Sequence, residues 1–449
     1  MKVTLLEHQK SAVSFIDHTT FLGALLWHEM GLGKTISALF ALRNLIAKLR
    51  AGGCANPKVI CLLPKSMVNQ WKAETQKFAP DIFSNIIFLP YSQLKKAKGL
   101  IMYYDVRALV LDESHYIKTQ GTNRVGDLCD LLDAIHDSHG SFKGGKIICL
   151  SGTPMLNHAG EIYTTWALLA SSDIGKASKL LKDNKRYDMW KQSFTRAKEK
   201  SWSTRFGGKK YGTSAEGVEN NDKLNKLIGP VVHLRKASDC LDLPQKQIIP
   251  IDLGLPDDKL LTDAGKDGVL DDEAYMKILS ELAKAKTVHA IDWIRNFLSQ
   301  SSEQLIVFCP YKFPLEEIQK VFKNKCMLYT GAQSSNERKE AMDAFRNGNV
   351  RLALGTYKAM GVGLNMQFAH TTLYLGYPWT SGDVDQAMAR TDRMGQTGRT
   401  LHYFLMSGAN DHRILNLVKS KEEMIQTVED GLKEYEYQNL SALGIGDFL

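Results

Sequence analysis

The chain has 449 residues, of which 44% are hydrophobic and 24% are charged, and its formal net charge is +8. This length allows two or three domains, each with its own hydrophobic core. No apolar stretch approaches the roughly 20 residues that a membrane-spanning helix requires, and residues 1–5 lack a signal-peptide pattern, so we expect a soluble, intracellular protein without membrane contact.

The seven cysteines indicate neither a disulfide framework nor a zinc site. Cys61, Cys149 and Cys309 lie in apolar, strand-like runs, where reduced cysteine behaves as a small hydrophobic residue. No two cysteines have the C-x₂-C spacing of a structural zinc site. We therefore predict a reduced protein without a structural metal.

The first part of the chain alternates apolar strands with helical segments. Strands are predicted at residues 21–27, 58–63, 86–89, 107–111 and 146–150. This alternation is typical of an α/β fold in which helices cover both faces of a parallel sheet. Ligands in such folds bind at the carboxyl ends of the strands.

Residues 28–35 follow the first predicted strand, precede a helical pattern and read as a phosphate-binding loop. The backbone of Met30, Gly31, Leu32 and Gly33 would turn its N–H groups toward phosphate oxygens. Lys34 would supply a positive charge to the β- and γ-phosphates, and the Thr35 hydroxyl suits Mg²⁺. His28 occupies the position where the strict loop pattern has glycine. The expected ligands are ATP and Mg²⁺.

Asp112 and Glu113 end another predicted strand. Asp112 is a candidate Mg²⁺ ligand, and Glu113 is a candidate base for activating water. An Asp-Glu pair alone is usually a solvated strand end, but its order after the phosphate loop favours nucleoside triphosphate hydrolysis.

A basic insert follows, predicted over residues 173–248. Residues 174–212 contain twelve Lys and Arg residues against three Asp and Glu residues, interleaved with aromatic side chains. Such a mixture suits a nucleic-acid backbone with bases nearby. An amphipathic helical insert with its aromatic side chains in the core explains it equally well. Gly207 and Gly208 indicate a β-hairpin between the flanking runs.

The α/β alternation returns in a second lobe, predicted over residues 288–449, with strands at residues 304–309, 325–329, 350–354, 371–375 and 400–406. A linker with Pro250 and Pro256 is predicted over residues 249–287, and the first lobe over residues 1–172. Arg390 and Arg393 fall on a predicted helix at residues 383–392 or directly after it. Residues three apart share a helix face, so both guanidinium groups would point into one cleft. Beside a triphosphate they would act as arginine fingers; otherwise they are ordinary surface arginines.

The order of these motifs resembles superfamily 2 helicases, and among them the Snf2-like DNA translocases. Leu234-Arg235-Lys236 and the run at 241–246 resemble segments that join the two lobes in Snf2-like proteins. The resemblance implies two RecA-like parallel-sheet lobes with ATP hydrolysis between them. It also implies a role in adenine recognition for Gln9.

The resemblance implies further site residues, each at a motif position. The implied catalytic set includes, besides Lys34, Asp112 and Glu113, the motif VI residues Gln386, Arg390 and Arg393. Gly363 is implied in nucleotide binding, and coupling of hydrolysis to domain movement is implied for Ser151, Gly152 and Thr153. Contacts with DNA are implied for Pro64, Lys65, Ser66, Tyr311, Lys312, Thr356 and Lys358.

The expected function is an ATP-dependent DNA translocase or helicase that acts on duplex or branched DNA without sequence preference, working as a monomer in replication or recombination. The compact form resembles microbial members, including bacteriophage-encoded branch-migration proteins, and is expected to lack the accessory modules of chromatin remodellers. A phage-encoded protein would act in the bacterial cytoplasm, and a eukaryotic one in the nucleus. Displacement of bound proteins from duplex DNA, a DExH RNA helicase and a non-catalytic DNA-binding scaffold are the alternatives.

Overall fold

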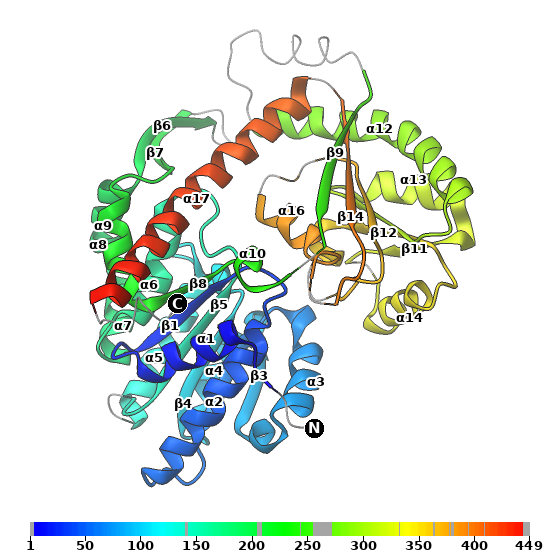
Figure 1. Ribbon diagram of the computed structural model, residues 1–449. Helices are drawn as coiled ribbons and strands as arrows, with labels where there is room; N and C mark the ends of the chain where they lie inside the picture. The colour runs from blue at the N-terminus through cyan, green and yellow to red at the C-terminus, as the bar shows by residue number, and fades with distance from the viewer. Residues whose placement is uncertain are drawn as a thin grey trace. The chain divides into compact units, whose positions relative to one another are not determined.

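The chain forms two compact units. The first comprises Met1–Leu241 together with Glu423–Leu449, and the second comprises Asp242–Glu422 (Figure 1). The computed structural model describes residues 4–139, 142–203, 209–242, 244–254, 272–331, 333–361, 364–376, 378, 381–393, 395–407 and 409–442.

A six-stranded parallel sheet forms the centre of the first unit, in the order β3-β2-β4-β5-β1-β8. Most of its strands are continuous apolar runs that are buried on both faces, as a parallel sheet requires. The strands are β1 (Gly23–His28), β2 (Lys58–Leu63), β3 (Ile86–Pro90), β4 (Val106–Asp112), β5 (Lys146–Ser151) and β8 (Val232–Arg235).

Helices cover both faces of this sheet because alternate strand side chains point to opposite sides. Leu26 packs in the core with α1 (Glu7–His18), α2 (Lys34–Ala51) and α3 (Val68–Phe78), whereas Leu25 packs in the core of the opposite face. The helices of that opposite face are α4 (Leu94–Leu100), α5 (Asn123–His139), α6 (Tyr163–Leu169), α7 (Ile174–Lys182), α8 (Asn184–Phe194) and α9 (Asn221–Ile228).

The stretch predicted as a basic insert contains three of these helices, α7, α8 and α9, and a separate antiparallel pair of strands, β6 (Arg196–Ser203) and β7 (Lys209–Glu216). The glycines that indicate its turn, Gly207 and Gly208, lie outside the described residues. Trp190 and Phe194 of α8 are buried in the core of the first unit, and Tyr187 packs against it. For these three aromatic residues the structural interpretation is therefore the right one.

The second unit repeats the architecture with a sheet in the order β11-β12-β10-β13-β14-β9, again all parallel. Its strands are β9 (Lys246–Asp252), β10 (Leu305–Cys309), β11 (Cys326–Tyr329), β12 (Leu352–Thr356), β13 (Thr371–Tyr374) and β14 (Thr400–Met406). The helices that cover it include α12 (Asp272–Gln300) and α13 (Lys312–Phe322) on one face, and α14 (Ser335–Arg346), α15 (Tyr357–Met360) and α16 (Ser381–Met388) on the other. The predicted class of two RecA-like α/β lobes is confirmed.

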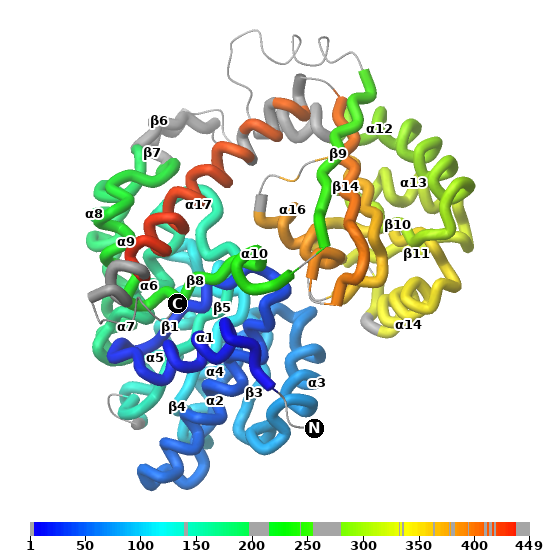
Figure 2. The backbone as a smooth tube through the Cα atoms, in the orientation of Figure 1, coloured from blue at the N-terminus to red at the C-terminus, as the bar shows by residue number. Residues whose placement is uncertain are grey.

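The last helix, α17 (Ala409–Ala442), begins in the second unit, and its later part belongs to the first. Figure 2 shows the later part of α17 beside the helices of the first unit. Val428 and Leu432 of this part belong to the core of that unit. Among the described helices, none has the length and apolar character needed to cross a membrane.

Candidate active site

The phosphate-loop segment connects the end of β1 to the start of α2. Gly31 and Gly33 adopt left-handed conformations, with φ values of 86° and 75°. A Cβ atom on Gly33 would lie 2.5 Å from the Gln9 side-chain nitrogen. Glycine is therefore required at position 33 by both its backbone angle and the space around it.

Helix α1 holds this loop through Leu32. The main-chain oxygen of Leu32 accepts hydrogen bonds from Gln9 Nε2 at 3.2 Å and from His8 Nε2 at 2.9 Å. Gln9 Oε1 accepts from the Leu6 main-chain nitrogen, so both polar ends of this amide contact the protein. Gln9 thus stabilises the loop, and its role in adenine recognition stays a prediction.

Lys34 is held at the loop by main-chain oxygen atoms. Its Nζ donates to the His28 oxygen at 2.8 Å and lies 3.4 Å from the Glu29 oxygen. Gly152, from the segment predicted to couple hydrolysis to movement, also lies here, because a Cβ on it would be 3.4 Å from the His28 oxygen and 3.7 Å from Lys34 Nζ. Residues after β5 therefore lie against the phosphate loop, and Thr35 follows Lys34 in the first turn of α2.

Asp112 ends β4 in a buried position, with 5% of its surface exposed. Its carboxylate accepts hydrogen bonds from Trp71 Nε1 at 2.8 Å and from the Glu113 main-chain nitrogen at 3.1 Å. Burial, reinforced by the negative charge of Glu113, raises the pKa of Asp112 to about 7, although Trp71 and Lys34 oppose the shift. Two adjacent carboxylates in so poorly solvated a place favour a further positive charge, and the donor set therefore fits Mg²⁺.

Glu113 has a left-handed backbone conformation, with φ of 50°, and its carboxylate lies 3.3 Å from His115 Nδ1. His115 Nδ1 also lies 3.4 Å from Ser151 Oγ, which accepts a hydrogen bond from the Thr153 nitrogen at 3.1 Å. Polar contacts thus connect the Asp-Glu pair to the 151–153 segment.

The two motif VI arginines do not lie on the predicted helix, because α16 ends at Met388. The main-chain oxygen of Arg390 accepts from the Met366 nitrogen. Both guanidinium groups nevertheless converge, donating to the Leu364 oxygen at 3.2 Å from Arg390 and 3.4 Å from Arg393. The prediction that the two arginines share a helix face is therefore wrong, but their side chains share one site in the second unit. Gln386 is buried and its main-chain oxygen accepts from Arg390, while Gly363 lies outside the described residues.

The residues implied in DNA contact follow the carboxyl ends of three strands. Pro64, Lys65 and Ser66 come after β2, where Pro64 is buried and the other two are exposed. Exposed Lys312 and half-buried Tyr311 come after β10, and exposed Lys358 follows Thr356 at the end of β12. The lysines are available to a phosphate backbone, and their contact with DNA stays a prediction.

Sequence reasoning identified His28 as a departure from the usual loop but assigned it no partner. In the structure its Nε2 lies 2.7 Å from Nδ1 of His233, 205 residues later in the chain. No local pattern connects two such residues; only the pairing of β1 with β8 does. Trp71, the donor to Asp112, lies five residues after the run 64–66 that is implied in DNA contact.

Two family descriptions match the chain, in the order that the motifs predict. The SNF2-related domain matches residues 8–89, and the helicase conserved C-terminal domain matches residues 288–395. Both matches agree with the predicted resemblance to the Snf2-like members of superfamily 2.

Curated relatives align with about nine tenths or more of this chain. Human DNA annealing helicase and endonuclease ZRANB3 is 24% identical, over 90% of this chain and 39% of its own length. An uncharacterized ATP-dependent helicase of Mycoplasma pneumoniae is 23% identical, over 96% of this chain and 43% of its own. The SWI/SNF-related matrix-associated actin-dependent regulator of chromatin subfamily A-like protein 1 of Xenopus tropicalis is 23% identical, over 89% and 42%.

The chain thus aligns with about two fifths of the length of these curated relatives. Among solved structures, the Sulfolobus solfataricus SWI2/SNF2 ATPase core in complex with dsDNA is similar, with 19% identity and a TM-score of 0.39. The similarity covers 99% of this chain and 97% of that chain.

Proposed function

We propose that this chain is an ATP-dependent DNA translocase that acts on duplex or branched DNA. The observation that carries the proposal is the edge of the first sheet, where Lys34 and the buried Asp112 come from separate strand ends. A buried carboxylate with a raised pKa at a phosphate loop suits metal-assisted phosphoryl transfer better than structural packing. Relatives named as ATP-dependent and DNA annealing helicases support this choice.

In this mechanism the main chain of residues 30–33 binds the phosphates, and Lys34 exchanges its main-chain acceptors for phosphate oxygens. Glu113 accepts the proton of the attacking water and is oriented through His115. Thr35 and Asp112 would hold Mg²⁺, which supplies charge to the β- and γ-phosphates. Arg390 and Arg393 stabilise the negative charge that develops in the transition state.

Movement along DNA follows from a change in affinity between states with and without the γ-phosphate. Lysines at positions 65, 312 and 358 would contact phosphates, which carry no base information, so binding should be tolerant of sequence and sensitive to salt. We expect a monomer to suffice, a point that light scattering of the active protein on DNA measures directly.

The decisive experiment compares ATP hydrolysis without DNA and with plain duplex, three-way forks and four-way junctions. A translocase shows strong stimulation by DNA, and a fork-remodelling enzyme also converts the forks or junctions to new products. The variant Glu113→Gln, which retains ATP binding and lacks the base, is the control. Equal hydrolysis with and without DNA contradicts the proposal, and a wild type that hydrolyses no ATP leaves the scaffold alternative.

The β6–β7 hairpin is a candidate junction-contacting element, because its two strands form a sheet of their own. Deleting residues 201–213 should impair processing of forked DNA more than DNA-stimulated hydrolysis on plain duplex. Equal loss of both activities would remove this assignment.

A second output of the same motor is displacement of proteins from duplex DNA, which a bound repressor on labelled duplex tests. Removal of the repressor with no fork conversion would favour that output over branch migration.

A further inference from the structure

The C-terminal part of α17 is connected to the phosphate loop through the end of β8. In the parallel pairing of β1 with β8, His28 lies opposite Arg235 and Leu26 opposite His233. The Glu29 main-chain nitrogen donates to the Arg235 oxygen at 2.9 Å. The strand end at 235 therefore borders the first two residues of the loop segment, His28 and Glu29.

A chain of side-chain hydrogen bonds runs beside this strand pair. His233 lies 2.7 Å from His28 through Nδ1 and 2.9 Å from Ser11 Oγ through Nε2. Arg235 in turn donates to Ser11 Oγ at 3.2 Å. His28 and His233 are almost completely buried, so these bonds are shielded from water.

The direction of the donors follows from Arg235, which can only donate. Ser11 Oγ accepts from it, and among the described residues the Ser11 hydroxyl has no acceptor besides His233 Nε2. His233 Nδ1–H then donates to His28 Nε2. Burial and the positive charges nearby hold the pKa of both histidines well below 6.5, so the relay operates with neutral rings.

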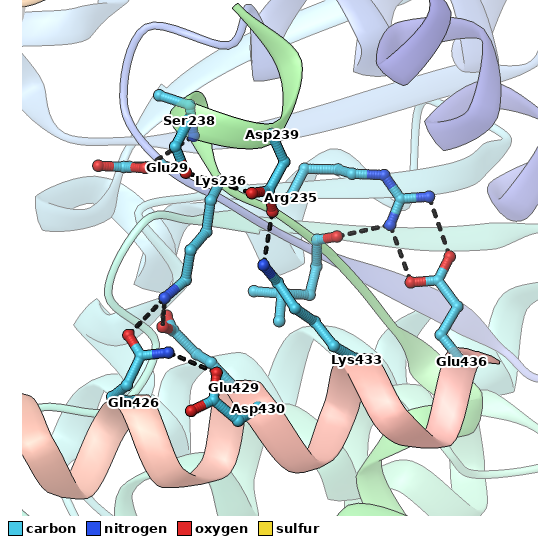
Figure 3. Close-up of polar contacts among 12 residues, drawn as sticks. Glu29, Arg235, Lys236, Ser238, Asp239, Gln426, Glu429, Asp430, Lys433 and Glu436 are labelled. Atoms are coloured by element: carbon cyan, nitrogen blue, oxygen red, sulfur yellow. Dashed lines mark hydrogen bonds and ion pairs between the residues drawn. The ribbon is translucent and has the colours of Figure 1, made fainter. Parts of the chain in front are cut away.

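Two carboxylates of α17 contact Arg235 and Lys236, as Figure 3 shows. Glu436 accepts two hydrogen bonds from the Arg235 guanidinium, each at 2.9 Å, in a forked geometry. Glu429 pairs with Lys236 at 2.8 Å, and both of these side chains are mostly buried.

Ala237, the residue after Lys236, contacts the phosphate-loop segment directly. The Ala237 main-chain nitrogen donates to the Glu29 carboxylate at 2.7 Å. Residues 235–237 are thus held by α17 on one side and hold His28 and Glu29 on the other. The main-chain oxygens of His28 and Glu29 are the acceptors of Lys34 Nζ.

We propose that Glu429 and Glu436 are positioning residues for Lys34, and that their contacts with Lys236 and Arg235 set the affinity of the first lobe for ATP. Ser11 and His233 connect Arg235, the partner of Glu436, to His28. The inference rests on the proposed ATPase function and adds to it a control element that comes from the far end of the chain.

The test measures binding of a fluorescent ATP analogue without DNA, together with KM and kcat on duplex DNA. Glu436→Gln retains the shape of the side chain and removes its charge. We expect the Kd and KM for nucleotide to rise about fivefold or more, with kcat within about twofold of wild type. A lowered kcat with unchanged nucleotide affinity would overturn the proposal.

A matched control lies on the same helix. Lys433 pairs with Asp239 at 2.6 Å, and both side chains are 42% exposed. Lys433→Gln removes a helix-docking ion pair outside the Arg235 and Lys236 contacts, and it should leave nucleotide affinity unchanged. An equal loss of affinity in Lys433→Gln would show that docking strength alone matters and would overturn the relay.

Ser11→Ala tests the path independently of α17, since it deletes one hydroxyl of α1. It should raise the Kd for nucleotide, and in combination with Glu436→Gln it should add little, because both changes interrupt one chain of bonds. Full additivity would overturn the shared path. A wild type that binds no ATP would instead refute the proposed function, so the two failures are distinguishable.

Discussion

The two lobes share one sheet architecture but bury titratable groups in different ways. The first lobe buries a pair of neutral imidazoles, His28 and His233, beside its phosphate loop. The second buries an ion pair between Lys286 of α12 and Asp411 of α17, each at most 3% exposed. The repeated fold therefore does not determine which titratable groups each lobe buries. Substituting those groups should affect the two lobes differently.

The largest effect is expected at the strand ends of the first sheet, where the candidate catalytic residues Lys34 and Asp112 lie. Lys34→Ala removes the charge on the β- and γ-phosphates, and turnover should fall by about 10³-fold with weaker nucleotide binding. DNA-stimulated phosphate release measures turnover. Lys320→Ala is a lysine control in the second lobe, where the side chain is mostly exposed and pairs with Glu317. A turnover in Lys34→Ala close to that of wild type would exclude Lys34 from the site.

Asp411→Asn tests the buried ion pair of the second lobe. It leaves the Lys286 ammonium in the core without a compensating charge and leaves a single uncharged oxygen to accept from the Ser407 main-chain nitrogen and hydroxyl. The free energy of unfolding should fall by about 3–5 kcal/mol. Urea titration monitored by circular dichroism measures it.

The matched control for that change is Glu281→Gln, also next to a lysine of α12, where both side chains are about half exposed. Its effect should stay within about 0.5 kcal/mol. If the two variants had equal effects, burial would not distinguish the two pairs.

Arg393→Ala asks whether the second lobe contributes to the chemistry of the first. Turnover should fall by about 10²-fold while the Kd for nucleotide stays close to that of wild type, because the role proposed for the guanidinium is to stabilise charge that develops only in the transition state. Single-turnover hydrolysis and equilibrium binding separate the two quantities. An unchanged rate would remove Arg393 from the catalytic set.

The smallest effect is the pH dependence of the buried imidazoles. Their folded-state pKa values lie below the value of 6.5 that unfolded histidine has, so above that pH they contribute no pH dependence. As the pH falls below 6.5, the unfolded chain binds protons that the folded lobe does not, and stability declines by up to about 1.4 kcal/mol per pH unit for each histidine.

Urea unfolding of the wild type and of His233→Gln at pH 7.5 and 5.5 measures this difference. The variant should lose less stability over that interval, since one of the two buried imidazoles is gone. An equal loss of unfolding free energy in both proteins would show that other groups determine the decline in stability at low pH.

The sequence predicts ten of the twelve strands that the structure describes in the two six-stranded sheets, because these ten are apolar runs bounded by turn residues. It misses β8, which has only four residues and includes His233 and Arg235, and it divides β9 between the basic insert and the linker. Pro250 fits in β9 because this strand lies at the sheet edge, where one side needs no hydrogen-bond donors. Short and edge strands carry a weak apolar signal, and their pairing is decided by the rest of the sheet.

The motif residues of the first lobe were predictable because each follows a strand end in a fixed spacing. The end of α16 was not, since the helical period continues through Arg390 while the main chain turns to bond Met366. The contact of His28 with His233 depends on strand register across 205 residues, which no local spacing encodes.

The return of α17 to the first lobe has a consequence for biosynthesis. The piece that contributes Val428, Leu432 and Glu436 leaves the ribosome after the entire second lobe has been made. A nascent first lobe therefore lacks the core side chains of Val428 and Leu432, and its Arg235 lacks the contact with Glu436, until α17 has been synthesised. On the proposed role of Glu436, a first lobe without this helix binds ATP more weakly until the second lobe has been synthesised.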